Sequence, residues 1–172
     1  HLSDGEKVVF LSIHADSLHP SLRGAMAYVP GARYRRGEYG KSGGVYAARK
    51  EVRERPSVSF SYSDRIKSEG LSRELAGKVI HAFREHHLPV HDVKPIRDRV
   101  VRSRREWVPA ILRYNEVPAQ LLLEVCNLAN ADDVELIQTR EFRQRVAEAT
   151  VAGIVDYYGD PQPLPLETVA AR

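Results

Sequence analysis

Short apolar runs recur along this chain, separated by polar stretches that contain glycine and proline. Four of them have the length and composition of strands, at residues 7–13, 24–29, 108–112 and 118–125. The runs at 7–13 and 118–125 are nearly continuous, which is typical of strands buried on both faces of a parallel sheet. The run at 108–112 contains Pro109, which indicates an edge strand or an irregular strand start.

A second pattern has the period of a helix. Leu71, Leu75, Val79 and Phe83 recur every four residues, and His87 falls on the same stripe. This spacing predicts an amphipathic helix over residues 72–87, with Ser72 as its N-cap and His87 as a core residue.

Two further helices are expected at residues 132–137 and 140–157. Strands and helices that alternate in this order predict an α/β fold with a mixed, mostly parallel sheet flanked by helices. The pattern breaks down over residues 30–65, which we interpret as an insertion or a long loop. Residues 160–172 contain several prolines and are expected to form a tail outside the domain.

Composition narrows the class of protein. Of 172 residues, 42% are hydrophobic and 28% are charged, which excludes a fibrous or wholly disordered chain. No apolar run approaches the roughly 18 residues that a membrane-spanning helix needs. The single cysteine, Cys126, excludes an internal disulfide. The net charge of +3 favours contact with anionic polymers without choosing between nucleic acid and cell wall.

Two polar residues close the two most apolar strands. His14 follows the run at 7–13, and Glu124 follows three leucines. Ligands of open α/β sheets bind beyond the carboxyl ends of the strands, so parallel strands would bring both side chains to one rim. One interpretation is that His14 binds a metal and Glu124 acts as a general base. The other is that both residues are structural, with the histidine held by hydrogen bonds and the glutamate in a salt bridge. The spacing favours neither interpretation.

The same residues carry a family resemblance. Residues 12–17, Ser-Ile-His-Ala-Asp-Ser, resemble the "SIHAN" motif of zinc-dependent N-acetylmuramoyl-L-alanine amidases. Residues 118–130 resemble that family's "P-x-x-L-x-E-x-G-F-x-S-N" stretch, and the final helix resembles its carboxyl end. The resemblance implies a phosphorylase/hydrolase-like fold, in which residues 1–159 are the carboxyl-terminal part of the catalytic domain. It also implies that His14 is a zinc ligand and Glu124 the catalytic carboxylate.

The implied reaction is hydrolysis of the amide between N-acetylmuramic acid and L-alanine of the peptidoglycan stem peptide, in the periplasm or outside the cell. Asp16 stands where the family has Asn, and Cys126 and Asn127 replace its Gly-Phe pair, so contacts to the substrate are expected to differ. The family's other zinc ligands, a histidine and a glutamate, precede its "SIHAN" strand. We therefore expect this chain alone to hold zinc weakly or not at all.

Other residues could complete a metal site. His86, His87 and His91 cluster in the sequence, but Pro89 interrupts the helix between the last two, so a metal role is disfavoured. Cys126 is a potential soft ligand that we expect to pack as a small hydrophobic residue.

Three alternatives concern the whole chain. An inactive relative could dock on peptidoglycan without cutting it. A nucleic-acid-binding domain would use the run of arginines at 97, 99, 102, 104 and 105, but this run lacks a known motif, and we expect no nucleic-acid partner. A solvated basic face, or a surface for stem-peptide carboxylates, accounts for the same run.

Residues 30–65 raise a question of regulation. A short helix near residues 46–55 offers Glu51 and Glu54 as carboxylates that could cover a metal site until an activator protein displaces them. A basic tether to an anionic wall is the alternative interpretation.

Overall fold

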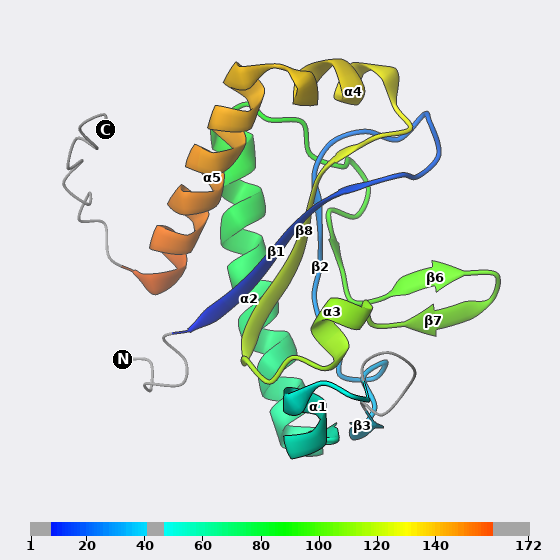
Figure 1. Ribbon diagram of the computed structural model, residues 1–172. Coiled ribbons are helices and arrows are strands. Elements are labelled where there is room, and N and C mark those ends of the chain that lie inside the picture. The colour runs from blue at the N-terminus through cyan, green and yellow to red at the C-terminus, as the bar shows by residue number, and fades with distance from the viewer. Residues whose placement is uncertain (1–7, 41–46, 160–172) are drawn as a thin grey trace.

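The computed structural model describes residues 8–40 and 47–159, and Figure 1 shows its arrangement. Its centre is a four-stranded sheet in the order β1-β8-β2-β5. β1 runs parallel to β8, β2 runs antiparallel to β8, and β5 runs parallel to β2. The predicted mixed, mostly parallel sheet is therefore confirmed. The strands are β1 (Val9–Asp16), β2 (Met26–Tyr28), β5 (Ile96–Arg97) and β8 (Ala119–Asn127).

Helices cover the sheet unequally. α2 (Tyr62–Glu85) and α5 (Arg140–Tyr158) pack side by side on one face and enclose the main core, and α4 (Ala131–Gln138) precedes α5. Among the described residues, the helices and strands on the opposite face are the short α3 (Ala110–Arg113) and a projecting hairpin of β6 (Val100–Arg102) and β7 (Arg105–Trp107). The site is built on this second, more open face. None of the helices within the described ranges has the length and apolar character to cross a bilayer.

α2 begins ten residues earlier than the sequence pattern predicts. Its N-cap is Ser61, whose hydroxyl accepts a hydrogen bond from the Asp64 amide while the Asp64 carboxylate accepts one from the Ser61 amide. This capping box fixes the start of the helix. Ser72 is instead buried inside the helix, where its hydroxyl accepts from the Gln120 amide. The prediction of Ser72 as N-cap is wrong because a polar residue that tethers β8 was taken for a helix start.

The end of α2 also differs from the prediction. The helix ends at Glu85, and His87 adopts a left-handed conformation with φ of 53°. Its side chain is exposed, so the expectation of a core histidine is wrong. The helical stripe stops at Phe83, and the chain then turns toward the sheet.

The run at 108–112 forms α3 rather than a strand. Pro109 lies at its N-cap, and the Pro109 carbonyl accepts hydrogen bonds from the amides of Leu112 and Arg113. Val108 and Leu112 are nonetheless fully buried. The apolar pattern therefore predicted burial correctly, but its short length left the type of element open.

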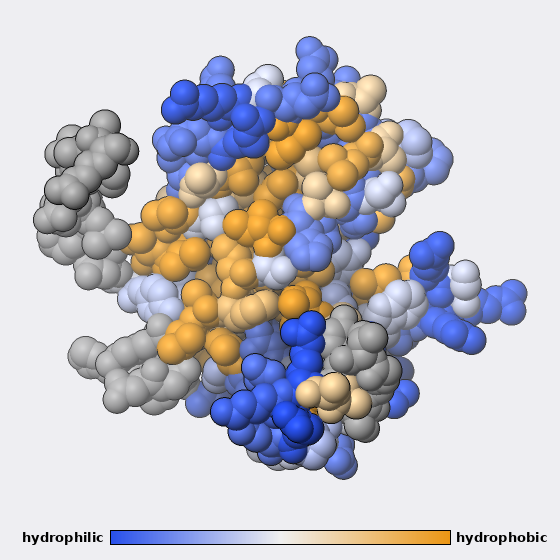
Figure 2. Space-filling view, in the orientation of Figure 1, coloured by the Kyte–Doolittle hydropathy of each residue, from blue (hydrophilic) through white to orange (hydrophobic). Residues whose placement is uncertain are grey.

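β1 is an edge strand, whereas β8 is buried along its whole length. Val8 and Ile13 expose 53% and 57% of their surface, so the prediction that both faces of β1 are buried is wrong. Figure 2 shows apolar residues gathered over β1 and α5, where Val151 is also half exposed.

Residues 30–65 are only partly irregular. They contain a two-stranded sheet of β3 (Glu38–Gly40) and β4 (Ser57–Ser59), together with α1 (Lys50–Glu54). Arg35 in this segment is 98% buried, which is unusual for a charged residue in a loop. The middle of the segment and the tail at 160–172 lie outside the described residues.

Candidate active site

The register of the two central strands brings the predicted pair together. His14 of β1 lies directly opposite Glu124 of β8 in the parallel ladder. Leu122, two residues before Glu124, packs on the face away from α2 and α5, and alternation along the strand places Glu124 on that face too. His14 is exposed, whereas Glu124 exposes only 7% of its surface. The register therefore places the two residues next to each other at one rim of the sheet, as expected of parallel strands.

Glu124 has an unusual electrostatic environment. Burial raises the pKa of its carboxyl to about 7, and the negative charge of Asp16 adds to this. One carboxylate oxygen, Oε2, is buried and has no hydrogen-bond partner among the described residues. A carboxyl that titrates near neutral pH is well suited to accept a proton and return it during a reaction.

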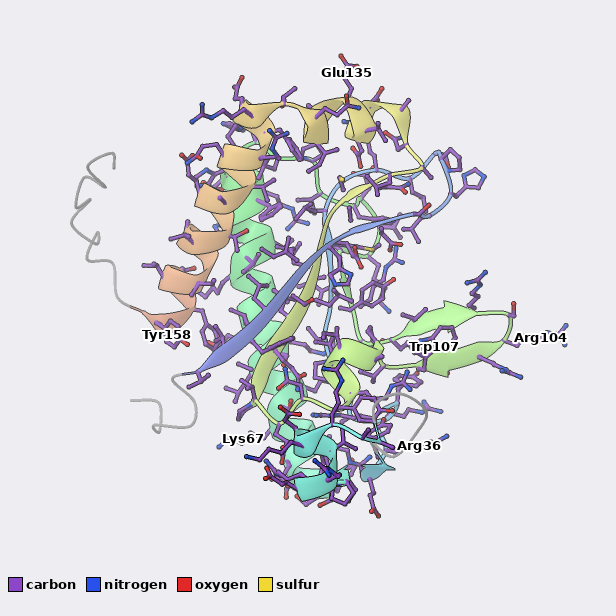
Figure 3. All side chains as sticks on the ribbon, viewed as in Figure 1. Arg36, Lys67, Arg104, Trp107, Glu135 and Tyr158 are labelled. Carbon is purple, nitrogen blue, oxygen red and sulfur yellow. The ribbon has the colours of Figure 1, made fainter. Side chains whose placement is uncertain are left out.

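A cavity of about 820 Å³ opens in front of Glu124. Tyr28, Leu122 and Glu124 line it from the sheet, and Asp16 and the residues that follow β1 form one side. The hairpin of β6 and β7 forms the other side, with Trp107 near its base (Figure 3). This volume is within the range of small-ligand sites and can accommodate a short peptide.

The hairpin side of the cavity is rich in cations: Lys94, Arg97, Arg99 and Arg102. Arg99 forms ion pairs with Asp98 at 2.8 Å and Glu106 at 2.7 Å. Arg97 is different, since its Nη2 lies 3.1 Å from Nε2 of His91 and its guanidinium lies 6.0 Å from the Tyr28 ring. Within the described part of the chain, no carboxylate pairs with Arg97.

The rim of the cavity is held by two polar residues that the sequence analysis did not single out for this role. Asn127 accepts a hydrogen bond from the Leu18 amide and donates to the Leu22 carbonyl, which fixes the loop after β1. Asp133, 1% exposed, accepts from the amides of Gly24 and Asn127. Their position at the end of a buried strand and at a helix start was the available signal.

The described residues do not complete a zinc site. Zinc in hydrolytic sites commonly has three protein ligands and a water. Over residues 8–40 and 47–159, no group of three His, Cys, Asp or Glu side chains is arranged to hold a metal ion. His14 is a single candidate ligand beside Glu124. His91 is buried against Arg97 and His87 is exposed at a turn, so these two do not add to it.

Cys126 is buried with 1% exposure, and burial raises the pKa of its thiol to about 11. It therefore packs as a small hydrophobic residue, as predicted.

α1 lies at the other end of β8 from Glu124 (Figure 1). Arg55, which follows α1, pairs at 2.7 Å with Glu116, just before β8 begins. Glu54 pairs with Lys50, and neither Glu51 nor Glu54 lines the cavity. In this structure the two carboxylates do not cover the site.

Comparisons with known proteins concern the family and the fold. The model of a family described as N-acetylmuramoyl-L-alanine amidase matches residues 2–156. Among solved structures, Ami1 from Mycobacterium smegmatis has a TM-score of 0.55 at 18% identity, over 88% of this chain and 54% of that one. The catalytic domain of CwlV from Bacillus (Paenibacillus) polymyxa has a TM-score of 0.51 at 21% identity, over 88% and 57%. Both likenesses concern the fold.

A third similar structure is the CwlD amidase from Clostridioides difficile in complex with the GerS lipoprotein, with a TM-score of 0.51 and 16% identity over 88% of this chain and 54% of that one. No curated protein matches the chain. The chain spans little more than half the length of these structures. The family match, in contrast, extends over nearly the whole chain and includes both His14 and Glu124. The chain therefore belongs to the N-acetylmuramoyl-L-alanine amidase family.

Proposed function

We propose that this chain carries the catalytic carboxylate of a peptidoglycan amidase that hydrolyses the bond between N-acetylmuramic acid and L-alanine of the stem peptide. The observation that carries the proposal is Glu124, a buried carboxyl with a pKa of about 7, on the floor of an 820 Å³ cavity and opposite His14. The family match supports the choice of substrate.

Glu124 would act as general base and then as general acid. It takes a proton from the attacking water as the water oxygen bonds to the carbonyl carbon of the lactyl group. It then donates that proton to the nitrogen of L-alanine as the carbon–nitrogen bond breaks. A carboxyl with a pKa near the working pH can perform both transfers, because both its protonated and its ionised form are well populated.

Zinc dependence belongs to the same proposal. Bound zinc would lower the pKa of a coordinated water. His14 is the ligand that this chain's described residues offer, and its exposed imidazole is free to reach a metal. Metal analysis after dialysis checks this part: we expect the 172-residue chain to retain little zinc, because affinity depends on several preset ligands. One tightly held zinc per chain would contradict it.

Glu124→Gln in the full-length protein tests the catalytic role. We expect the rate of release of new amino-terminal L-alanine from muramoyl peptides to fall by about a hundredfold to ten-thousandfold. Glu135→Gln is the matched control, because Glu135 is exposed on α4 and points away from the cavity (Figure 3). Activity of Glu124→Gln within about threefold of the unmodified protein would remove Glu124 from the mechanism.

A second candidate function is peptidoglycan binding without hydrolysis. It is favoured by one observation, that the described residues do not form a complete metal group. The same experiment separates the two functions. A protein that binds peptidoglycan, exposes no new amino-terminal L-alanine under any metal condition and is unaffected by Glu124→Gln is a binding domain.

A location in the cell envelope and an activator protein acting on residues 30–65 remain predictions. The similar structure of an amidase bound to a lipoprotein supports the second prediction, because it shows that a protein of this fold can bind a partner protein. Because α1 lies away from the cavity, we expect deletion of residues 33–62 not to raise activity on soluble muramoyl peptides. A clear rise would instead support a covering role.

A further inference from the structure

We propose that Arg97 binds a free carboxylate of the stem peptide, so that the site selects acidic stem peptides over amidated ones. This inference rests on the proposed function and concerns the same cavity. It assigns a specificity role to a residue on β5, at the opposite edge of the sheet from His14 on β1.

Arg97 is held in place by neutral groups. It lies on β5 directly beside Tyr28 of β2 in the parallel ladder. Its Nη2 donates to Nε2 of His91, which is 6% exposed, and its guanidinium faces the Tyr28 ring, which is 5% exposed. Burial and the charge of Arg97 lower the pKa of His91, so the imidazole stays neutral at neutral pH. These contacts orient the guanidinium without neutralising it.

The neighbouring arginines with structural roles form ion pairs with carboxylates. Arg99 lines the same cavity and pairs with both Asp98 and Glu106. Arg73 on α2 pairs with Glu69 and again with Asp98. Arg97 is also half-buried, and leaving a half-buried charge without a counter-ion costs free energy. An anionic ligand in the cavity would supply that counter-ion.

The chemistry of a guanidinium group favours one class of anionic ligand. Its planar donors match a carboxylate, which they can bind through two parallel hydrogen bonds. In the proposed substrate, the residues that follow L-alanine carry carboxylates that some cell walls leave free and others convert to amides. An amide offers one oxygen and no charge, so it would lose the charge-assisted part of the contact.

The spacing of the strands fits this substrate. Glu124 pairs with Met26 of β2 and Arg97 with Tyr28, so the two residues lie two strand spacings apart (roughly 10 Å) and two residues apart along β2 (roughly 7 Å), which gives roughly 12 Å between their backbones. Both side chains line the cavity and shorten this interval, so two or three extended residues, at about 3.3 Å each, can connect the two groups. A substrate whose alanine amide lies at Glu124 would therefore place a carboxylate of its second or third residue near Arg97.

The test measures binding of stem tripeptides, L-alanine followed by γ-linked D-glutamate and a diamino acid, by calorimetry with the full-length protein. One peptide carries free side carboxylates, the other carries amides, and both end in a carboxyl-terminal amide. We expect the acidic peptide to bind roughly tenfold or more tightly than the amidated one. Arg97→Met should abolish the preference, and Arg97→Lys should retain part of it.

Arg104→Met is the matched control, because Arg104 is at the tip of the hairpin and does not line the cavity (Figure 3). It should leave the preference unchanged, and thermal unfolding checks that every variant is folded. Equal affinities for the two peptides, or a preference that survives Arg97→Met, would overturn the inference. A preference lost equally in Arg104→Met would indicate a diffuse basic surface and would also overturn it.

Two further comparisons identify which residue supplies the carboxylate and separate binding from hydrolysis. Dipeptides that end at glutamate, in acidic and amidated forms, show whether the second residue alone supplies the carboxylate. The peptides contain no bond to N-acetylmuramic acid, so their binding is independent of hydrolysis. Failure to expose a new amino-terminal L-alanine on any muramoyl peptide would refute the amidase proposal, whereas equal binding and equal cleavage of both forms would refute only the role of Arg97.

Discussion

Glu124 combines a carboxyl group with surroundings that favour its neutral form. It exposes 7% of its surface, and its Oε2 has no hydrogen-bond partner among the described residues. The neighbouring strand residues are leucine and valine, which cannot stabilise a charge. A protein that needed only stability would have an apolar residue here, since the buried carboxyl is costly once it ionises.

This cost gives a pH dependence with a definite sign. The pKa of Glu124 rises from an unfolded value of 4.5 to about 7 in the fold, so the folded state binds the proton more tightly. The free energy of unfolding should therefore fall as pH rises from about 4.5 to 7. Glu124→Gln removes this loss, and above pH 7 it should be more stable than the unmodified chain by up to about 3 kcal/mol.

Urea unfolding of both chains across pH 4–8, with a metal chelator present, measures the difference. Groups that do not interact with Glu124 titrate equally in the two chains and cancel, whereas Asp16, whose charge acts on Glu124, contributes to the measured difference. A difference that does not change with pH would show that Glu124 ionises normally in the fold.

At the scale of residues, the sequence predicted those that interrupt an apolar run. His14 and Glu124 stand out because a polar side chain at the end of a buried strand needs a reason. Asn127, Asp133 and Arg97 were not identified as site residues, because their roles depend on partners far away in the sequence, such as Leu18, Gly24 and Tyr28. Only the fold brings these partners together.

At the scale of elements, α2 and α5 approach each other closely at a glycine. A side chain at Gly153 of α5 would place its Cβ 2.5 Å from the Cα of Val79 on α2. The two helix backbones therefore touch, and this contact fixes how both helices sit on the sheet that carries Glu124. Gly77 of α2 is also inside a helix, but a Cβ there would meet nothing within 4 Å.

The two glycines form a matched pair for a stability test. Gly153→Ala should destabilise the fold by about 1–3 kcal/mol, because the helices must separate to admit a methyl group. Gly77→Ala should stabilise it by about 0.5–1 kcal/mol, because alanine is the better helix former and meets no obstacle. Chemical denaturation of both variants gives the two values. Equal effects at the two sites would mean that the helices can separate at no cost.

Elements whose apolar residues recur with a regular period were predicted well. Elements that are marked only by a few local residues, such as a helix cap, were not. The ends of the helices after β8 were predicted within one or two residues. Asn130 and Thr139 are the N-caps of these helices, and asparagine and threonine are residue types that commonly occur there. The start of α2 was missed, because its first turns carry few apolar residues and only the capping box at Ser61 marks them. The hairpin of β6 and β7 was seen only as a run of arginines, since it lies outside the core.

At the scale of the whole molecule, the sequence indicated the fold class but did not show how residues 30–65 relate to the body. The absence of a regular pattern there predicted an insertion or a long loop. The structure instead anchors the segment through Arg35, whose charge would be unfavourable in a core without partners. Three separate parts of the chain meet this one residue, through the Phe60 ring, the Ser68 hydroxyl and the backbone carbonyls of Arg113 and Asn115. No periodicity along the sequence reveals this.

Arg35 links the segment to α2 and to the turn before β8. Its guanidinium donates to the carbonyls of Arg113 and Asn115 and lies 3.6 Å from the centre of the Phe60 ring. Burial lowers the pKa of Arg35 to about 10, so it remains charged at neutral pH. The stabilisation therefore comes from hydrogen bonds and ring contact that compensate a desolvated cation.

Arg35→Met should lower the free energy of unfolding by about 2–3 kcal/mol, because two carbonyls lose their donor and the side chain loses its polar contacts. Arg36→Met is the control, since Arg36 is exposed, and its effect should stay within about 0.5 kcal/mol. Urea unfolding measures both, and proteolysis reports whether residues 33–62 become accessible in Arg35→Met. If the two substitutions have equal, small effects, then the segment is only loosely attached to the domain. A large effect of Arg35→Met makes the segment part of the domain that supports β8, and hence part of what positions Glu124.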